Sequence, residues 1–561
     1  MKIIGRIAIS LFTIAATFAY AQTNLFPQVQ HVVVVIQENR TPDNLFQQDQ
    51  TLINNGAHIV SKGSCGDSFG FFNLQPTLLA TCWDTAHLHS AWTKMWANGA
   101  MTGGCQVKSY NAGCLPTPAC TDTNYGYCPA MTYVQNTMWG SQSTDYILEP
   151  YFEIANQYGW ANYMFQTSQG PSFPAHQFLF SGTSQPIAYN DPQLPCGNGT
   201  YPCYQWFDGE NTNQVTNGCI ADSTVQALDI DPTSSESYSY TPPYPVNSLG
   251  FPCYEHPSLA TLLDTANITW KYYARAPSDL WNAPTAINPI CQTTGYGDKG
   301  GVCNGTDWIN NVGAVLPNSK NYPSDAAPFL TDVTNCKLSQ VSWVIPDGDW
   351  SDHNGYEPGD GGPSWVAAIV NAIGQSSCKD GSVPYWQDTV ILVTWDDWGG
   401  LYDDVVPPDC ATNPCTGYNG GGGNGKQYVY GFRVPLLVVS AYAKPSYISG
   451  PQSNPQCIGN TYCHDFGSIL NFIEYAFGTG GTSLGTIGDS HWPYADAFVL
   501  DTAAPPNNYS LYDFFKFSQI QTPTFTTIKG AKYPPSCFHT PTATGCFPSY
   551  PVDPDNDVNE D

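Results

Sequence analysis

The sequence predicts an α/β protein with a doubly wound, mostly parallel sheet flanked by helices. Two solid apolar runs, 32–36 (VVVVI) and 389–394 (TVILVT), are the first observation. Continuous β-branched runs of this length are typical of strands buried on both faces, as in a parallel sheet covered by helices. The second observation is that further strand-like runs alternate with helix-like stretches along the chain, which favours a parallel sheet.

Residue type and spacing predict the remaining elements in chain order. Runs rich in Val, Ile, Trp and Tyr are expected as strands, and stretches with apolar residues every three or four positions as helices. Pro363-Ser364 marks a helix start, because proline suits the first helical turn. The expected strands are 32–36, 268–274, 340–345, 389–394 and 434–443, and the expected helices are 151–165, 259–266, 365–373 and 467–477.

Residues 1–21 have the organisation of a secretory signal peptide. Lys2 and Arg6 form a positive start, 7–18 is mostly apolar, and 19–21 (AYA) is a small-residue cleavage signature. A retained membrane anchor is the alternative, but a span needs about 20 apolar residues. We therefore expect a protein secreted to the periplasm or the medium, without stable insertion in a membrane.

The cysteines and the charge narrow the class of protein. All 20 cysteines lie after the signal peptide, and an even count in an exported chain predicts disulfides rather than metal clusters. Cys410 with Cys415 and Cys457 with Cys463 are expected to close small loops. The net charge of −28 disfavours nucleic acid and anionic membranes as partners.

We expect one catalytic domain over 22–550 and an acidic, disordered tail over 551–561. Two Cys-rich stretches, about 63–130 and 185–255, are interpreted as insertions held by disulfides. No signal in the sequence predicts the oligomeric state.

Oxygen-rich side chains follow both of the long apolar runs. Glu38 and Asn39 come after the first run, and Asp396 and Asp397 come after the second. Ligands of open parallel sheets bind outside the carboxyl ends of the strands, so these four side chains are expected to converge. An all-oxygen set suits one hard divalent ion, Ca²⁺ or Mg²⁺, with Mn²⁺ possible. The alternative is that each acidic pair simply ends a strand.

Ser172, in the segment GPSFPAH, is the candidate nucleophile. A serine before Phe-Pro also suits the start of a helix, so a purely structural cap is the alternative. The same geometry favours a nucleophile, because a helix N-terminus stabilises an alkoxide and an incoming phosphate.

Three of the ten histidines are candidates for catalysis. His353 ranks first, His87 second and His464 third, as contacts to phosphate or as groups that protonate a leaving group. An isolated histidine is more often structural, which is the alternative for each of them.

Five blocks in this order resemble the bacterial phosphoesterase family of the alkaline phosphatase superfamily, which includes acid phosphatases and phosphatidylcholine-type phospholipases C. The blocks are VVVVIQENRTPDNLF, GPSFPAHQFLFSG, SWVIPDGDWSDH, ILVTWDDWGGLYDDVVPP and RVPLLVVSAYAK with HDFGSILNFIE. The resemblance implies an alkaline-phosphatase-like fold and a hydrolase of phosphate esters or phospholipid head groups. It also implies metal ligation by Glu38, Asn39, Asp396 and Asp397, attack by Ser172, and a phosphate pocket lined by His87 and His353.

The chain departs from the family pattern at several positions. Ala175-His176 stands where many members have Asn-Arg, and Asp404 where a histidine often follows Tyr-Asp. The choice between phospholipid diester and phosphomonoester therefore stays open. A sulfatase-like hydrolase and a non-catalytic exported binding protein with a structural Ca²⁺ are the alternative functions.

Overall fold

The computed structural model describes most of the chain from Phe26 onward. The described residues are 26–66, 70–110, 126–184, 209–211, 218–222, 225, 227–230, 237–238, 251–293, 301–317, 328–355, 359–408, 430–453, 457, 462–479, 482–488, 494–501, 509–538 and 545–546. The expected signal peptide, most of the 185–255 insertion, the pair Cys410 and Cys415, and the acidic tail lie outside them.

A seven-stranded sheet forms the centre of the fold. In spatial order its strands are β13 (Trp270–Tyr273), β14 (Val341–Val344), β1 (His31–Gln37), β17 (Thr389–Trp395), β18 (Leu436–Ser440), β8 (Gly159–Ala161) and β19 (Tyr447–Ser449). β18 runs against its two neighbours, and the other neighbouring pairs are parallel. The prediction of a mostly parallel sheet is confirmed.

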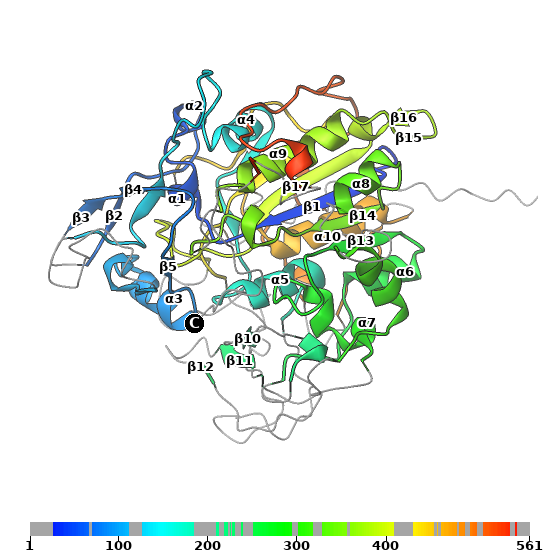
Figure 1. The fold of residues 1–561 in the computed structure, drawn as a ribbon, viewed down its shortest axis with the longest axis horizontal. Coiled ribbons are helices and arrows are strands. Elements are labelled where there is room, and N and C mark those ends of the chain that lie inside the picture. Colours follow the sequence, from blue (N-terminus) through cyan, green and yellow to red (C-terminus); the bar gives the residue numbers. More distant parts are fainter. Residues whose placement is uncertain are drawn as a thin grey trace, which may run out of the picture.

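Helices cover both faces of this sheet, as Figure 1 shows. The larger ones are α4 (Glu149–Gln157), α5 (Ser172–Ser181), α8 (Pro328–Thr334), α9 (Gly362–Gly374) and α10 (Phe466–Phe477). Phe180 of α5 packs on Tyr272 of β13, and Phe329 of α8 packs on Tyr273, with ring centroids 5.4 and 5.3 Å apart. Successive strand residues point to opposite faces, so α5 and α8 lie on opposite sides.

The core is densest around the two central strands. Every residue of β1 and β17 is buried, and Gln37 pairs with Trp395 at their carboxyl ends. Burying each Val or Ile side chain contributes about 1.5–3 kcal/mol, so the two runs stabilise the centre of the sheet. That register also brings Glu38 and Asp396 to the same edge of the sheet.

Further helices and strands complete the described part of the chain. The helices are α1 (Pro42–Leu45), α2 (Gln50–Asn54), α3 (His89–Trp96), α6 (Leu259–Thr265) and α7 (Asn288–Cys291). The strands are β2 (Lys62–Ser64), β3 (Phe71–Asn73), β4 (Gln75–Thr77), β5 (Asp84–Thr85), β6 (Ser109–Tyr110), β7 (Thr132–Val134), β9 (Met164–Phe165), β10 (Gly209–Asn211), β11 (Ala227–Ile230), β12 (Ser237–Tyr238), β15 (Lys379–Asp380), β16 (Val383–Pro384) and β20 (His464–Asp465).

One expected element is wrong in part. The helix predicted over 151–165 ends at Gln157, and Gly159 begins strand β8. A Cβ on Gly159 would lie 2.6 Å from Phe514, so the glycine permits a close approach that a helix would not make. Tertiary packing therefore overrides the helical pattern.

Disulfides join several of the described cysteines. They are Cys65–Cys105, Cys219–Cys253, Cys291–Cys303, Cys336–Cys378, Cys457–Cys463 and Cys537–Cys546. The small loop expected between Cys457 and Cys463 is confirmed. None of the helices in the described part of the chain has the length and apolarity that crossing a membrane requires. The single domain over 22–550 stays a prediction.

Candidate active site

The ends of β1 and β17 are tied together just where the acidic side chains begin. The Asn39 amide donates to Asp396 Oδ1 at 2.9 Å, and the Asp396 amide donates to the Gln37 carbonyl at 2.8 Å. Asn39 adopts a left-handed backbone with φ of 60°, which asparagine tolerates better than most residues. A Cβ on Gly399 would lie 2.5 Å from the Asn39 carbonyl, so only glycine allows the two strand ends to approach this closely.

Ser172 opens helix α5 and points at these strand ends. Its Oγ lies 3.2 Å from Glu38 Oε2, 3.2 Å from Asp397 Oδ2 and 3.5 Å from Asn39 Oδ1. One hydroxyl proton serves one acceptor at a time, so the serine cannot satisfy all three oxygens. The predicted serine and the four predicted metal ligands therefore meet in one buried cluster.

This cluster fits a divalent cation. Asp396 Oδ2 is buried and has no hydrogen-bond partner among the described residues, as expected of an oxygen that binds a cation. Burial and the charge of Asp396 raise the pKa of Asp397 well above its usual range, so the pair needs a positive charge to stay ionised. Ligands about 2.1 Å from an octahedral ion lie about 3 Å apart, close to the separations around Ser172 Oγ.

His176 belongs to the same cluster, although we did not predict it as a site residue. Its Nε2 lies 3.0 Å from Glu38 Oε1 and 3.8 Å from Asp396 Oδ2. Burial lowers the pKa of His176 to about 4, against the opposing charge of Asp396. The spacing carried a usable signal, because residues i and i+4 of a helix share a face, and Ser172 is four residues earlier.

His87 and His353 come together as predicted, and Asp84 joins them. The ligand atoms of the three side chains lie within 4.8 Å of one another, and the two imidazole centroids are 5.6 Å apart. Burial lowers the pKa of His353, His87 lowers it further, and the charges of Asp84 and Asp396 oppose the shift. Asp84 lies three residues before His87, but no sequence signal marked it, because it meets His353 only in the folded chain.

Buried polar contacts fix the loop that carries His353. Gln37 donates to the Trp350 carbonyl at 3.0 Å and accepts from the Asp352 amide at 3.0 Å. The Arg40 guanidinium donates to the Asp352 carbonyl at 2.5 Å. Residues on both sides of Glu38 and Asn39 therefore hold the histidine loop in place.

His464 lies in another network. Its Nδ1 is 2.6 Å from Asp501 Oδ2, and its Nε2 is 2.9 Å from Ser449 Oγ. Ser449 is fully buried and donates to Asp513 Oδ2 at 2.5 Å. The His464 imidazole thus contacts Asp501 and Ser449, and its Nε2 lies 3.9 Å from Asp513 Oδ1. The structure does not bring His464 into the cluster of Ser172, and its catalytic role stays a prediction.

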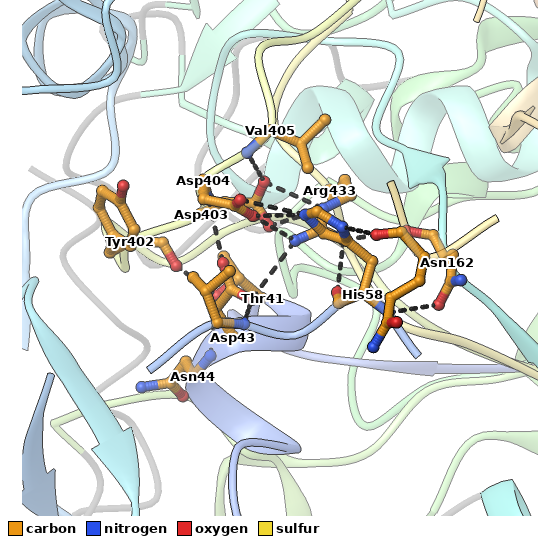
Figure 2. Close-up of polar contacts among 12 residues, drawn as sticks. Thr41, Asp43, Asn44, His58, Asn162, Tyr402, Asp403, Asp404, Val405 and Arg433 are labelled. Carbon is orange, nitrogen blue, oxygen red and sulfur yellow. Dashed lines mark hydrogen bonds and ion pairs between the residues drawn. The ribbon is translucent and has the colours of Figure 1, made fainter. Parts of the chain in front are cut away.

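A buried arginine anchors the loop after the Asp396-Asp397 pair (Figure 2). Arg433 Nε donates to both oxygens of Asp403 at 3.0 Å, and its Nη2 lies 3.1 Å from Asp404 and 3.4 Å from Asp43. His58 Nε2 also lies 3.0 Å from Asp404 Oδ2. Asp404, where the chain departs from the family pattern, is therefore part of this ion cluster.

The fold brings the clustered carboxylates, serine and histidines together as a candidate active site at the carboxyl edge of an α/β sheet. The model of the Phosphoesterase family matches residues 29–480. This chain belongs to that family, as the resemblance of its motifs implied.

Several curated relatives are phospholipases C. Phospholipase C B of Mycobacterium tuberculosis is 32% identical over 203 residues, which are 34% of each chain. Phospholipase C A of the same organism is 26% identical over 44% of this chain and 43% of its own. Non-hemolytic phospholipase C of Pseudomonas aeruginosa is 22% identical over 86% of this chain and 58% of its own. The matched region thus spans less than two thirds of each of these relatives.

A solved protein of the alkaline phosphatase superfamily from Vibrio parahaemolyticus resembles the chain only slightly. It is 9% identical, with a TM-score of 0.29, over 82% of this chain and 69% of its own.

Proposed function

We propose that this protein is an exported, metal-dependent phosphoric-ester hydrolase with Ser172 as its nucleophile. The observation that carries the proposal is the position of Ser172 Oγ, 3.2 Å from a carboxylate oxygen of Glu38 and of Asp397 at the start of helix α5. A purely structural cap does not need two acidic partners from the ends of two different strands.

The side chains of this site can transfer the phosphoryl group in two displacement steps, first to Ser172 and then to water. Ser172 Oγ attacks phosphorus and forms the new O–P bond, and the ester O–P bond breaks on the opposite side. The hydroxyl proton passes to a carboxylate oxygen within reach, Glu38 Oε2 or Asp397 Oδ2. Water then hydrolyses the phosphoseryl intermediate, which restores Ser172 and releases the phosphate product. The amide groups at the N-terminus of α5 favour the negative charge that develops at both steps.

Glu38, Asn39, Asp396 and Asp397 are the residues that would hold the divalent ion. Such an ion lowers the pKa of a bound hydroxyl and neutralises phosphoryl oxygens. We assign His353 and His87 to the phosphoryl oxygens and the departing alcohol, since their rings lie together beside the loop that carries Asp397.

We infer a phosphodiester with a phospholipid head group as the substrate class, because the named relatives are phospholipases C. Export agrees with the disulfides, which form and persist in oxidising compartments. A phosphomonoester is the alternative substrate.

Hydrolysis of two chromogenic esters tests the proposal. p-Nitrophenylphosphorylcholine and p-nitrophenyl phosphate are compared from acid to neutral pH, with and without a chelator. We expect chelator-sensitive turnover of the diester, and a loss of at least about 10³-fold in kcat for Ser172→Ala, the size seen when a nucleophile is removed. Ser181→Ala, on the same helix, is the matched control and should retain full activity.

The outcomes separate the alternatives. Faster turnover of p-nitrophenyl phosphate would identify a monoesterase, and full activity of Ser172→Ala would remove the serine from the mechanism. A sulfatase would carry a formylglycine at position 172, visible in the intact mass, and would cleave p-nitrophenyl sulfate. A binding protein would hold the metal and hydrolyse none of these esters.

A further inference from the structure

The hairpin of strands β2 and β3 turns one face to the protein and the other to solvent. In the pairing of the two strands, Gly63 lies opposite Phe72, and Ser64 lies opposite Phe71. Residues directly opposite in an antiparallel pair share a face, and successive pairs point to opposite faces. Phe71 is 83% exposed, the highest value among the large hydrophobic side chains that the structure describes. Phe71 therefore lies on the outer face of the hairpin and adds little to the core.

The inner face of the hairpin packs on a second hydrophobic core, which adjoins the candidate active site. Phe72 packs against this core, whose members include Trp398 and Tyr402. A Cβ on Gly63 would lie 2.5 Å from the Tyr402 ring, so the hairpin rests directly on that side chain. Trp398 and Tyr402 belong to the segment that directly follows the predicted metal ligand Asp397. The hairpin is therefore held beside the loop that leaves the metal cluster.

The hairpin lies on the same side of the sheet as the candidate active site. Helix α1 follows the carboxyl end of β1, and Figure 1 shows β2 and β3 on that side, with β15 and β16 at the opposite end of the sheet. Leu78, which follows β4, is 57% exposed. The carbonyl of the next residue, Leu79, accepts a hydrogen bond from Arg40 at 3.0 Å, and Arg40 directly follows Asn39. Leu78 and Phe71 are thus two exposed apolar side chains on the side of the active site.

The charge of this part of the chain differs from that of the whole. Residues 50–110 contain three lysines and two aspartates, in a chain whose net charge is −28. The three lysines, Lys62, Lys94 and Lys108, are exposed. Lys62 shares the outer face of the hairpin with Phe71, because it lies two residues before Ser64, the partner of Phe71. The surface around the hairpin therefore combines apolar side chains with cations.

This combination suits the surface of a phospholipid bilayer. Apolar side chains enter the boundary between head groups and acyl chains, while lysine ammonium groups stay at the level of the phosphates. An anionic membrane would repel a chain of this net charge, whereas a zwitterionic bilayer has no net charge. We propose that the outer face of the β2–β3 hairpin, with Phe71, Leu78 and Lys62, docks the protein reversibly on a zwitterionic phospholipid bilayer.

The docked contact is peripheral, and it brings the candidate active site to the lipid head groups. An advantage for hydrolysis rests on the proposed function, because only a phospholipid substrate lies in the membrane. Docking itself does not depend on the reaction, so the two can be tested apart.

Sedimentation with phosphatidylcholine vesicles tests docking without a reaction. The mature protein is mixed with vesicles in the presence of a chelator, and the bound fraction is measured after centrifugation. We expect the wild type to bind and Phe71→Ser to bind roughly tenfold more weakly, since moving one aromatic side chain out of water accounts for at least that factor. Phe71→Leu keeps an apolar side chain and should retain most of the binding.

Val383→Ser is the matched control. Val383 is 40% exposed on the hairpin of β15 and β16, at the opposite end of the sheet, and this variant should bind vesicles as the wild type does. Hydrogen exchange of the wild type gives a readout that needs no variant. Vesicles should slow the exchange of backbone amides in β2 and β3 and leave those of β15 and β16 unchanged.

Hydrolysis then separates docking from chemistry. For each protein, the rate on phosphatidylcholine vesicles is divided by the rate on soluble p-nitrophenylphosphorylcholine. This ratio should fall about tenfold in Phe71→Ser, in proportion to the lost docking, and should keep its wild-type value in Val383→Ser.

A wild type that stays out of the vesicle pellet would overturn the inference, and so would equal binding of Phe71→Ser and the wild type. A concentration-dependent dimer that Phe71→Ser abolishes, without vesicle binding, would identify a contact between two copies of the chain instead. Docking that depends on Phe71, with no turnover of any phosphoester, would contradict the proposed function and leave this inference standing. Turnover of the soluble diester by a protein that does not bind vesicles would do the reverse.

Discussion

The position of His176 adds an imidazole nitrogen to the predicted metal-binding cluster, whose four predicted ligands offer oxygen atoms. Its Nε2 lies within 3.8 Å of carboxylate oxygens from both strand ends, and the ring is fully buried. Removal of this imidazole takes away either a metal ligand or the group that orients Glu38. An arginine, which many family members have here, could not act as a metal ligand.

We predict that His176→Gln weakens metal binding by about 10–100-fold, the usual effect of removing a group that orients a metal ligand. Activity should return in excess metal, because Ser172 and the four oxygen ligands remain. The measurement is a titration of the stripped protein with Mn²⁺ or Zn²⁺, followed by calorimetry and by turnover.

His256→Gln is the matched control for that titration. His256 is also fully buried, but its Nδ1 bonds the Pro257 carbonyl, and it is not part of the metal cluster. Equal metal affinities for His176→Gln and the wild type would contradict the role of His176.

At the residue scale, the sequence located side chains that directly follow a recognisable element. Glu38 and Asp396 were predictable because each comes immediately after a solid apolar strand, and Ser172 because it opens a helix. Asp84 was not predictable, since it follows no long strand and reaches His353 from 269 residues away, the separation of the contact between Thr85 and Asn354.

At the element scale, Arg433 ties together segments that are distant in the sequence. Its guanidinium contacts the loop of Asp403 and Asp404, helix α1 at Asp43, and the carbonyls of His58 and Asn162 at 2.9 and 3.0 Å. Burial raises the pKa of Asp43, against the opposing charge of Arg433, so this carboxylate depends on the arginine to stay ionised.

We predict that Arg433→Met lowers the free energy of unfolding by about 3–5 kcal/mol, because the substitution leaves buried carboxylates without their partner. Lys532→Met is the matched control. Lys532 and Asp360 form an ion pair whose side chains are 28% and 21% exposed, so its loss should cost no more than about 1 kcal/mol. Denaturant unfolding measures both values, and similar costs for the two variants would contradict the prediction.

Element prediction succeeded where packing and local pattern agree. Helix α10 was expected over 467–477 and spans Phe466–Phe477, since its apolar face meets the core and Asp465 caps its start. The pattern over 151–165 fits a helix as well, but β8 takes its second part because the strand fills the place beside β18. The order of the strands in the sheet could not be predicted from the sequence, because it depends on long-range pairing of this kind.

At the scale of the whole molecule, acidic side chains lie in the interior as well as on the surface. Burial raises the pKa of Asp388 to about 8 with help from Asp380, and it raises the pKa of Asp347 and Asp465 to about 7. The net charge of −28 adds repulsion at neutral pH. The folded state therefore keeps protons on these carboxyl groups at pH values where the unfolded state has lost them.

The direction of the pH dependence follows from these shifts. The ordinary pKa of an aspartate is 3.8, so above that pH the folded chain binds more protons at these three groups than the unfolded chain. Their contribution to stability is complete at low pH and is lost as the pH rises through about 7–8. His176 and His256 act in the opposite direction, because burial lowers the pKa of each from 6.5 to about 4. Their contribution is lost as the pH falls through that interval.

We therefore predict that the melting temperature of the metal-saturated protein falls between about pH 6.5 and 8, where the three carboxyls release their protons and the two histidines no longer oppose the trend. Calorimetry at constant ionic strength from pH 4 to 9 measures this profile. Asp388→Asn removes the group with the highest pKa of these three, so the fall between about pH 7 and 8 should become shallower in that variant. A melting temperature that rises from pH 6 to pH 8 would contradict the buried carboxyls as the source. The predicted profile also means that an acidic medium, where phosphoesterases of the acid type act, would stabilise this fold rather than strain it.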